Sequence, residues 1–258
     1  MTEMKVVPLG GLQESPYKLV LCYPKFSDRE FEKRISELSG LGVSALRFQG
    51  SKEIFGIKVL GKGCVGIVVS AFRQNERVAV KILRTDAGRS SLEHEASMLK
   101  LANSVDVGPK LIDVSESFLV MEYVEGLLLP DWLRGLKGRG KKRRLQETLR
   151  ALLEACYRLD QIGLDHGELS RAPKHVIVNA QDQPTIVDFE TASNHRRPSN
   201  VTSISQYLFV GSDLSKLITR ITGPIRRSAL MTSLKQYKKD RNVENFQEII
   251  RTVIPVWR

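Results

Sequence analysis

Short apolar runs dominate the first half of the chain, and this pattern predicts strands. The predicted elements of this half are, in order, strands at 57–72 and 76–84, a helix at 91–103, and strands at 110–114 and 118–126. Gln74 and Asn75 separate the first two strands, so these strands are expected to form a hairpin. The last strand is expected to run into a linker.

The second half has apolar residues at the three- and four-residue spacing of helices. Leucines recur at this spacing from Arg143 to Ile162, and Gly163 is expected to end the helix. Two short strands, at 175–179 and 185–189, are expected next. Beyond about Ser203 the apolar spacing predicts three further helices.

Residues 1–50 precede the strongest patterns and are interpreted as an N-terminal extension. Within them, 18–23 is strand-like, and a helix is expected from Ser27, as its N-cap, to about Leu38. A strand-rich part at 51–124 followed by a helix-rich part at 125–258 predicts an α+β, bilobal fold.

The composition is that of a globular protein, with 41% hydrophobic and 27% charged residues. No run approaches the roughly 20 apolar residues that cross a bilayer, and the N-terminus lacks the features of a signal peptide. The cysteines at positions 22, 64 and 156 are scattered, without metal-ligand spacing. We therefore expect a reduced, cytoplasmic protein.

The net charge of +11 attracts polyanions without choosing among ATP, RNA and acidic proteins. Much of it lies in two clusters, which comprise Lys137, Arg139, Lys141, Lys142, Arg143 and Arg144, and Lys235, Lys238, Lys239 and Arg241. The first cluster has no interleaved aromatic residues on which single-stranded bases would stack. RNA or ribonucleoprotein contact through this basic surface and a merely solvated loop remain alternatives.

Gly61, Gly63 and Gly66 form a GxGxxG string with strand-like residues on both sides. A dinucleotide-binding site would instead place a helix after the glycines. The context favours a glycine-rich hairpin whose backbone amides approach phosphates, because no Cβ intervenes. An ordinary tight turn is the alternative.

Lys81 lies on a valine-rich strand, on the same face as Ala79. A lysine buried there needs a partner of opposite charge. Glu95 lies on the apolar face of the following helix, whereas Glu93 fits a capping box with Ser90. We predict an ion pair between Lys81 and Glu95 that holds Lys81 toward the α- and β-phosphates of a nucleotide.

The glycine string, the motif Val78–Lys81 and the linker at 121–126 together resemble the protein-kinase superfamily, over about residues 55–195. The resemblance implies that the nucleotide is ATP. The residues that it implies around the adenine are Val68 and Ala79 on its faces, Met121 as gatekeeper, and backbone groups of Glu122 and Val124 at its edge.

Residues 164–170 look like the catalytic loop of RIO-type and aminoglycoside-type kinases, and 187–190 look like their metal-binding turn. The resemblance implies that Asp188 binds Mg²⁺ at the phosphates. Glu168 occupies the position of the catalytic aspartate and is expected to accept a hydroxyl proton, with Asp165 as an alternative base.

The stretch after Glu168 is about two residues longer than in the family, and His175 precedes the next strand in place of a metal-binding asparagine. His175 is a candidate metal ligand, although imidazole suits Mn²⁺ or Zn²⁺ better than Mg²⁺. A structural role for His175, and Lys174 as a substitute for a second metal, remain alternatives.

The segment after Phe189 lacks a long activation segment, so the chain most resembles small RIO-like serine/threonine kinases. This likeness implies transfer of phosphate from ATP, with Mg²⁺ or Mn²⁺, to a protein hydroxyl. Because the catalytic aspartate and the metal asparagine are replaced, a nucleotide-binding pseudokinase or a slow ATPase in an RNA–protein assembly is the alternative. A small-molecule kinase is disfavoured, since acidic residues in the second half are dispersed among basic ones.

Overall fold

The computed structural model describes residues 5–254, apart from the side chains of 171–173. The chain divides into two compact units: an N-terminal unit of Met1–Ser97 and Lys110–Tyr123, and a C-terminal unit of Met98–Pro109 and Val124–Arg258. The N-terminal unit carries an antiparallel sheet and the C-terminal unit is mainly helical, which confirms the α+β prediction.

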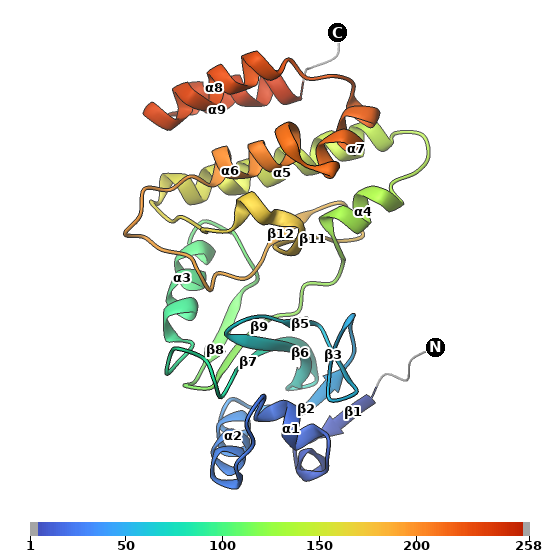
Figure 1. Ribbon diagram of the computed structural model, residues 1–258, viewed down its shortest axis with the longest axis vertical. Coiled ribbons are helices and arrows are strands. Elements are labelled where there is room, and N and C mark those ends of the chain that lie inside the picture. Colours follow the sequence, from blue (N-terminus) through green and yellow to red (C-terminus); the bar gives the residue numbers. More distant parts are fainter. Residues whose placement is uncertain (1–4, 255–258) are drawn as a thin grey trace. The chain divides into compact units, whose positions relative to one another are not determined.

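The sheet of the N-terminal unit has the strand order β1-β2-β6-β7-β9-β8, with β5 paired to β6 (Figure 1). Its strands are β1 (Lys5–Pro8), β2 (Val43–Phe48), β5 (Gly61–Lys62), β6 (Gly66–Arg73), β7 (Glu76–Leu83), β8 (Leu111–Val114) and β9 (Phe118–Glu122). A separate hairpin joins β3 (Lys52–Ile54) to β4 (Ile57–Val59). Gln74 and Asn75, with φ of 50° and 66°, form the turn between β6 and β7, so the predicted hairpin is confirmed.

The segment interpreted as an N-terminal extension contributes two strands to this sheet. Besides β1 and β2 it forms a 3₁₀ turn η1 (Leu9–Gln13) and the helices α1 (Tyr17–Leu21) and α2 (Asp28–Gly40). The strand expected at 18–23 is wrong: most of this run is helical, because Tyr17, Val20 and Leu21 recur at helical spacing and bury one face. Ser27 caps α2 as predicted, since its Oγ accepts a hydrogen bond from the backbone N–H of Glu30 at 3.3 Å.

A single hydrophobic core joins this segment to the rest of the N-terminal unit. It includes Leu12, Val20 and Leu38 from the first 40 residues, packed with residues of β6 and β7. Arg34 of α2 is also buried, where its guanidinium donates to the carbonyl of Leu21 and to Glu30, both at 2.6 Å. Residues 5–48 are therefore an integral part of this unit's packing.

The C-terminal unit is organised around the long helix α5 (Lys141–Gln161), which ends just before Gly163 as predicted. Its other helices are α4 (Leu129–Gly135), α6 (Asn200–Gln206), α7 (Asp213–Thr222), α8 (Arg227–Lys239) and α9 (Val243–Val253), with a 3₁₀ helix η2 (Leu169–Lys174) and a π-helical turn η3 (Tyr207–Gly211). A small sheet pairs β10 (Leu127–Leu128), β11 (Val176–Val178) and β12 (Pro184–Ile186) in that order. Helix α3 (Glu93–Asn103) begins in the N-terminal unit and ends in the C-terminal one.

Asp182, in the turn between β11 and β12, fastens the small sheet to two helices. Its carboxylate accepts hydrogen bonds from Arg144 of α5 at 2.6 and 2.8 Å and from Trp132 of α4 at 3.0 Å. Arg144 lowers the pKa of this carboxyl group. The side chain of Arg144 is thus engaged inside the unit, unlike most of the basic cluster to which it belongs.

Among the described residues, no helix has both the length and the apolar character needed to traverse a lipid bilayer.

Replacing Arg34 by alanine is expected to lower the free energy of unfolding by about 2–3 kcal/mol. The substitution leaves the buried Leu21 carbonyl without its donor and removes the partner of Glu30. Urea unfolding followed by circular dichroism measures the change. Arg29→Ala, an exposed arginine on the same helix, is the matched control and is expected to cost under about 0.5 kcal/mol. Equal losses in the two variants would contradict the role given to Arg34.

Candidate active site

The glycine-rich turn lies between β5 and β6 in the N-terminal unit. The N–H of Gly63 donates to the carbonyl of Gly66 at 2.8 Å and closes the turn. A Cβ on Gly66 would lie 2.9 Å from Cε of Lys81, so a larger residue there would displace the lysine. Gly66 is therefore required by the close passage of Lys81, whereas Gly61 pairs with Val68 in regular strand register.

Lys81 and Glu95 form the ion pair that the sequence predicts. Nζ of Lys81 lies 2.7 and 2.9 Å from the two carboxylate oxygens of Glu95. The side chains are only 4% and 2% exposed, so the two charges neutralise each other away from water. Glu93 stands at the start of α3, where its N–H is accepted by Ser91 at 3.4 Å and not by Ser90 as expected.

The residues expected around adenine fall in both units. In the sheet Val68 is opposite Lys81, and Ala79 is opposite Met121. Ala79 is buried, whereas Val68 and Met121 are partly exposed. The N–H of Glu122 donates to the carbonyl of Lys110 at 2.9 Å, so this donor is already used inside the N-terminal unit. Val124 belongs to the C-terminal unit.

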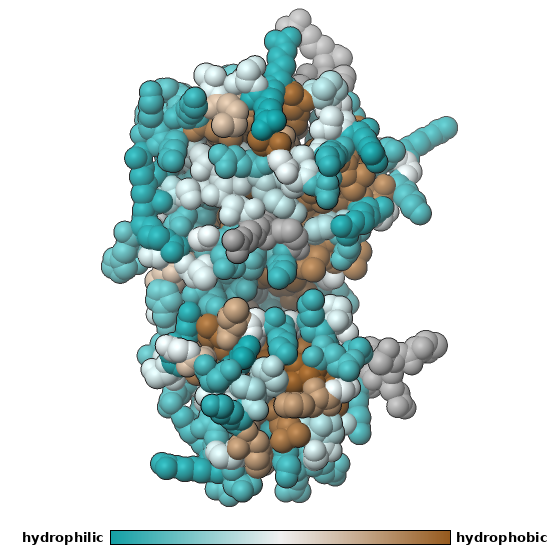
Figure 2. Space-filling view, in the orientation of Figure 1, coloured by the Kyte–Doolittle hydropathy of each residue, from teal (hydrophilic) through white to brown (hydrophobic). Residues whose placement is uncertain are grey.

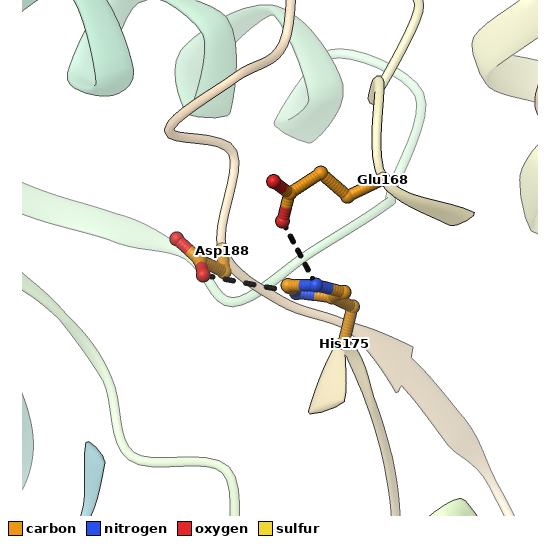
Figure 3. Close-up of side chains that lie close together, drawn as sticks. All are labelled: Glu168, His175 and Asp188. Atoms are coloured by element: carbon orange, nitrogen blue, oxygen red, sulfur yellow. Dashed lines mark ion pairs between the residues drawn. The ribbon is translucent and has the colours of Figure 1, made fainter. Parts of the chain in front are cut away.

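Glu168, His175 and Asp188 come together in the C-terminal unit (Figure 3). Nε2 of His175 lies 3.0 Å from a carboxylate oxygen of Glu168, and its Nδ1 lies 3.7 Å from one of Asp188. His175 is buried, while both carboxylate side chains are about 40% exposed. The atoms that could bind a metal all lie within 4.8 Å of one another, which suits one divalent cation.

The extra residues after Glu168 fold into the 3₁₀ helix η2, and this shortens the path to β11. His175 thereby stays at the start of β11, where its carbonyl accepts the N–H of Val187 at 2.9 Å. Asp188 follows β12 with φ of 69°, a left-handed conformation that is uncommon outside glycine. The lengthened loop therefore leaves Glu168, His175 and Asp188 facing one another.

His166 supports this loop from the interior. Its Nε2 lies 3.1 Å from the carbonyl of Val187, and its ring packs against Phe189 with centroids 5.0 Å apart. Its backbone N–H donates to Oδ1 of Asn200 at 2.9 Å. Burial, and secondarily the neighbouring His175, lower the pKa of His166 to about 4, so the ring is neutral at physiological pH.

A second group of buried polar residues holds Asn200 in place, and no sequence motif pointed to it. Asp160 of α5 accepts hydrogen bonds from the backbone and side-chain nitrogens of Asn200 at 2.9 and 2.8 Å, and from the hydroxyl of Tyr237 at 2.9 Å. Burial raises the pKa of Asp160. The one sequence signal was an acidic residue within the apolar pattern of α5, since Asp160 follows Leu159 and lies four residues after Cys156.

Asp165, the alternative base, has a structural role. Its carboxylate accepts from the backbone N–H of Ser199 at 3.0 Å and from Arg196 at 3.1 Å. Its backbone also pairs with Ser193. Because Asp165 is buried and multiply bonded, it is not suited to receive a proton from a substrate. Lys174 is exposed at the end of η2.

Comparison with known proteins identifies the family. The family model of protein tyrosine and serine/threonine kinases matches residues 55–208, more than half of the chain. The chain therefore belongs to the protein kinase family, whose members are phosphotransferases that use ATP and, in general, a divalent metal.

A relative is known in Streptomyces coelicolor (strain ATCC BAA-471 / A3(2) / M145). The chain is 30% identical over 152 residues to a probable serine/threonine-protein kinase of that organism. The match covers 52% of this chain and 22% of the relative, so the chain spans about a fifth of the relative's length.

The stability of the metal-free protein is expected to rise as the pH increases from 4.5 to 7. In this window an unfolded His166, with a pKa near 6.5, binds a proton that the folded residue, with a pKa of about 4, does not. This difference amounts to about 3 kcal/mol. Unfolding by urea at several pH values, in the presence of a chelator, measures it.

In that experiment His166→Gln is expected to remove most of the pH dependence, because glutamine does not titrate. His195→Gln, which changes an exposed histidine, is expected to keep it. If the His166 variant kept the slope of the wild type, the assignment would be wrong.

Proposed function

We propose that this protein is an atypical, RIO-like serine/threonine kinase that transfers the γ-phosphate of ATP to a protein hydroxyl group. The main support for this proposal is the buried Lys81–Glu95 ion pair, which packs directly against Gly66 of the glycine-rich turn. A buried lysine next to a turn of small residues provides a fixed positive charge beside backbone amides, which suits polyphosphate.

Residues drawn mainly from the N-terminal unit would bind the nucleotide. The amides around Gly61, Gly63 and Gly66 would approach the phosphates, and Lys81 would contact the α- and β-phosphates while Glu95 holds it in place. Val68, Ala79 and Met121 offer apolar contacts for adenine. Of the hydrogen-bonding groups expected at the adenine edge, the backbone of Val124 and the carbonyl of Glu122 are the candidates, since the N–H of Glu122 is engaged.

The residues of the C-terminal unit would act on the phosphate being transferred. Asp188 and His175 would hold the divalent cation, Mg²⁺ or Mn²⁺, which when bound neutralises charge on the phosphate oxygens. One oxygen of Glu168 lies 3.0 Å from Nε2 of His175, and the other is left to accept a proton. The acceptor oxygen would bond to the γ-phosphorus, the bond to the β–γ bridging oxygen would break, and the proton would pass to Glu168 as ADP leaves.

Two observations support the RIO-like subtype and the hydroxyl acceptor. Helix α6 begins at Asn200, so only residues 189–199 follow Asp188 before the next helix, and this leaves no room for a long activation segment. The Streptomyces relative is named as a probable serine/threonine-protein kinase.

The three cysteines are unpaired, which accords with a cytoplasmic location for this protein.

Contact with RNA is a second candidate function, and the distribution of charge favours it. Lysines and arginines outnumber aspartates and glutamates by 24 to 15 in the C-terminal unit but only by 16 to 14 in the N-terminal unit. Lys137, Arg139, Lys141 and Arg143 are exposed on the loop between α4 and α5 and in the first turn of α5, where hydrophilic side chains project (Figure 2).

These positive side chains stand at the end of α5 where the helix dipole is also positive. The first turn of α5 contains no acidic residue to balance them. A phosphate backbone placed there would be attracted by the side chains and by the helix terminus together. The RNA bound would be structured rather than single-stranded, since no aromatic residue interrupts 137–144.

Incubation with γ-labelled ATP, Mg²⁺ or Mn²⁺ and a generic protein acceptor is expected to label the acceptor or the protein itself. Lys81→Ala and Asp188→Asn are expected to lower the rate by about 100-fold or more, because each removes a group that stabilises phosphate charge. Lys52→Ala, an exposed lysine of β3, is the control and is expected to retain the activity. Circular dichroism verifies folding.

Two outcomes would contradict the kinase function when transfer is measured beside unfolding and phosphate release. In the first, ATP at a hundredfold excess over its dissociation constant raises the free energy of unfolding of the wild type by about 3 kcal/mol, yet no phosphate is transferred. The protein would then be a nucleotide-binding pseudokinase. If phosphate were released without reaching an acceptor, it would be an ATPase.

Changing Lys137, Arg139, Lys141 and Arg143 together to serine is expected to weaken binding to a structured RNA and to flatten its salt dependence. For every phosphate that the variant no longer neutralises, the slope of log K against log salt falls by about 0.9. The control changes Lys235, Lys238, Lys239 and Arg241 to serine, which removes the same charge elsewhere in the C-terminal unit. Fluorescence anisotropy at several salt concentrations measures both. If both variants weakened RNA binding equally, or if RNA binding by the wild type did not depend on salt, residues 137–143 would not be the RNA-binding surface.

A further inference from the structure

The proton of the His175 ring can be assigned from its neighbours. Nε2 lies 3.0 Å from a carboxylate oxygen of Glu168, which accepts hydrogen bonds but does not donate them. We therefore place the proton of a neutral His175 on Nε2, the nitrogen that lies beside this acceptor. This leaves the lone pair on Nδ1, the ring nitrogen that faces Asp188 (Figure 3).

Nδ1 of His175 is buried and has no hydrogen-bond partner among the described residues. Asp188 Oδ2, at 3.7 Å, is too distant for a hydrogen bond and is itself an acceptor. Two acceptors that face each other repel unless a cation lies between them. Two ligand atoms that share a cation through bonds of about 2.1 Å lie roughly 3–4 Å apart, which the observed separation matches.

We infer that Nδ1 of His175 and the carboxylate of Asp188 bind one divalent cation, that Glu168 orients His175 through Nε2, and that this site selects Mn²⁺ over Mg²⁺. The use of the ion in catalysis rests on the proposed kinase function, but its binding does not.

Glu168, His175 and Asp188 thus reproduce the carboxylate–histidine–metal arrangement found at many metal centres. In such centres the ring nitrogen that does not bind the metal donates to a carboxylate, which fixes the tautomer and increases the basicity of the ligand nitrogen. Glu168 is in this respect a positioning residue, in addition to its proposed role as a base. The 3₁₀ helix η2 links the two residues and holds this geometry.

The preference for Mn²⁺ follows from the ligand nitrogen. Mg²⁺ is a hard cation that takes oxygen ligands, whereas imidazole suits first-row transition metals. Where the resemblance to kinases expects an asparagine oxygen, this chain offers an imidazole nitrogen. The exchange lowers the affinity for Mg²⁺ relative to Mn²⁺.

In two alternative arrangements, no nitrogen of His175 would bind the metal. A doubly protonated His175 would pair with both carboxylates, and no nitrogen would then contact a metal. His166 also has a buried Nδ1 without a partner among the described residues, but it is not among the residues whose candidate ligand atoms lie within 4.8 Å. A spectroscopic measurement on bound Mn²⁺ distinguishes both arrangements from a metal bound to His175.

The experiment uses the full-length chain with Mn²⁺ and a non-hydrolysable ATP analogue. Pulsed electron paramagnetic resonance detects nitrogen bound to Mn²⁺ as a modulation of the spin echo. Protein grown with ¹⁵N-histidine is expected to change this modulation from a ¹⁴N to a ¹⁵N pattern, while adenine nitrogens remain ¹⁴N. His175→Asn is expected to lose the histidine signal, and His195→Asn, at an exposed position, to keep it.

The ratio of Mn²⁺ to Mg²⁺ affinity provides a second readout, measured by competition. His175→Asn is expected to lower this ratio at least tenfold. Glu168→Gln is expected to weaken Mn²⁺ binding about tenfold while the histidine signal persists, as for loss of a residue that orients a ligand.

An echo modulation that does not respond to ¹⁵N-histidine in the wild type would overturn the inference, and this result does not depend on whether any variant folds. If Mg²⁺ and Mn²⁺ then supported phosphate transfer equally well, the protein would be a kinase whose metal is not bound by His175. A histidine signal in a protein that transfers no phosphate would uphold the metal site and reject the kinase function instead.

Discussion

The buried ion pair between Lys81 and Glu95 is the interaction on which the N-terminal unit depends. Two charges that are 4% and 2% exposed are stable there only as a pair, since either one alone would lack both water and a partner. The pair joins Glu95 of α3 to Lys81 of β7, and it requires glycine at position 66 because Lys81 passes so close to it. A single ion pair thus connects a helix, a strand and a turn.

The C-terminal unit is organised by hydrogen bonds among buried polar residues, and its described residues include no buried lysine. A hydrogen-bonded group connects α5, α6 and α8 through Asp160, Asn200 and Tyr237. Asn200 also accepts a hydrogen bond from the backbone N–H of His166. His166 in turn binds the carbonyl next to Asp188. The loop that presents Glu168 and His175 is therefore supported from the protein interior, which allows its length to depart from that of the family.

The sequence predicted the parts that local periodicity governs. The β6–β7 hairpin, α5 and the pairing of Lys81 with Glu95 follow from two- and 3.6-residue repeats and from the cost of a lone buried charge. The strand predicted at 18–23 is wrong, because six apolar-rich residues fit a short helix or a strand equally well until their neighbours are known. Asp160 and Asn200 lie 40 residues apart, and nothing local marks them as partners. His175 was recognisable as a candidate ligand, but its tautomer depends on a contact created by η2.

The strand β2 has a consequence for any attempt to isolate the kinase portion of the chain. The family match begins at residue 55, after β2 has ended at Phe48. A chain cut at that point would keep β5 paired to the start of β6 but would uncover the edge of β6 at Ser70–Arg73, and the backbone groups that pair there with β2 would be open to another molecule. Such a fragment would be prone to self-association, so the boundary suggested by family likeness is not the boundary at which this protein folds.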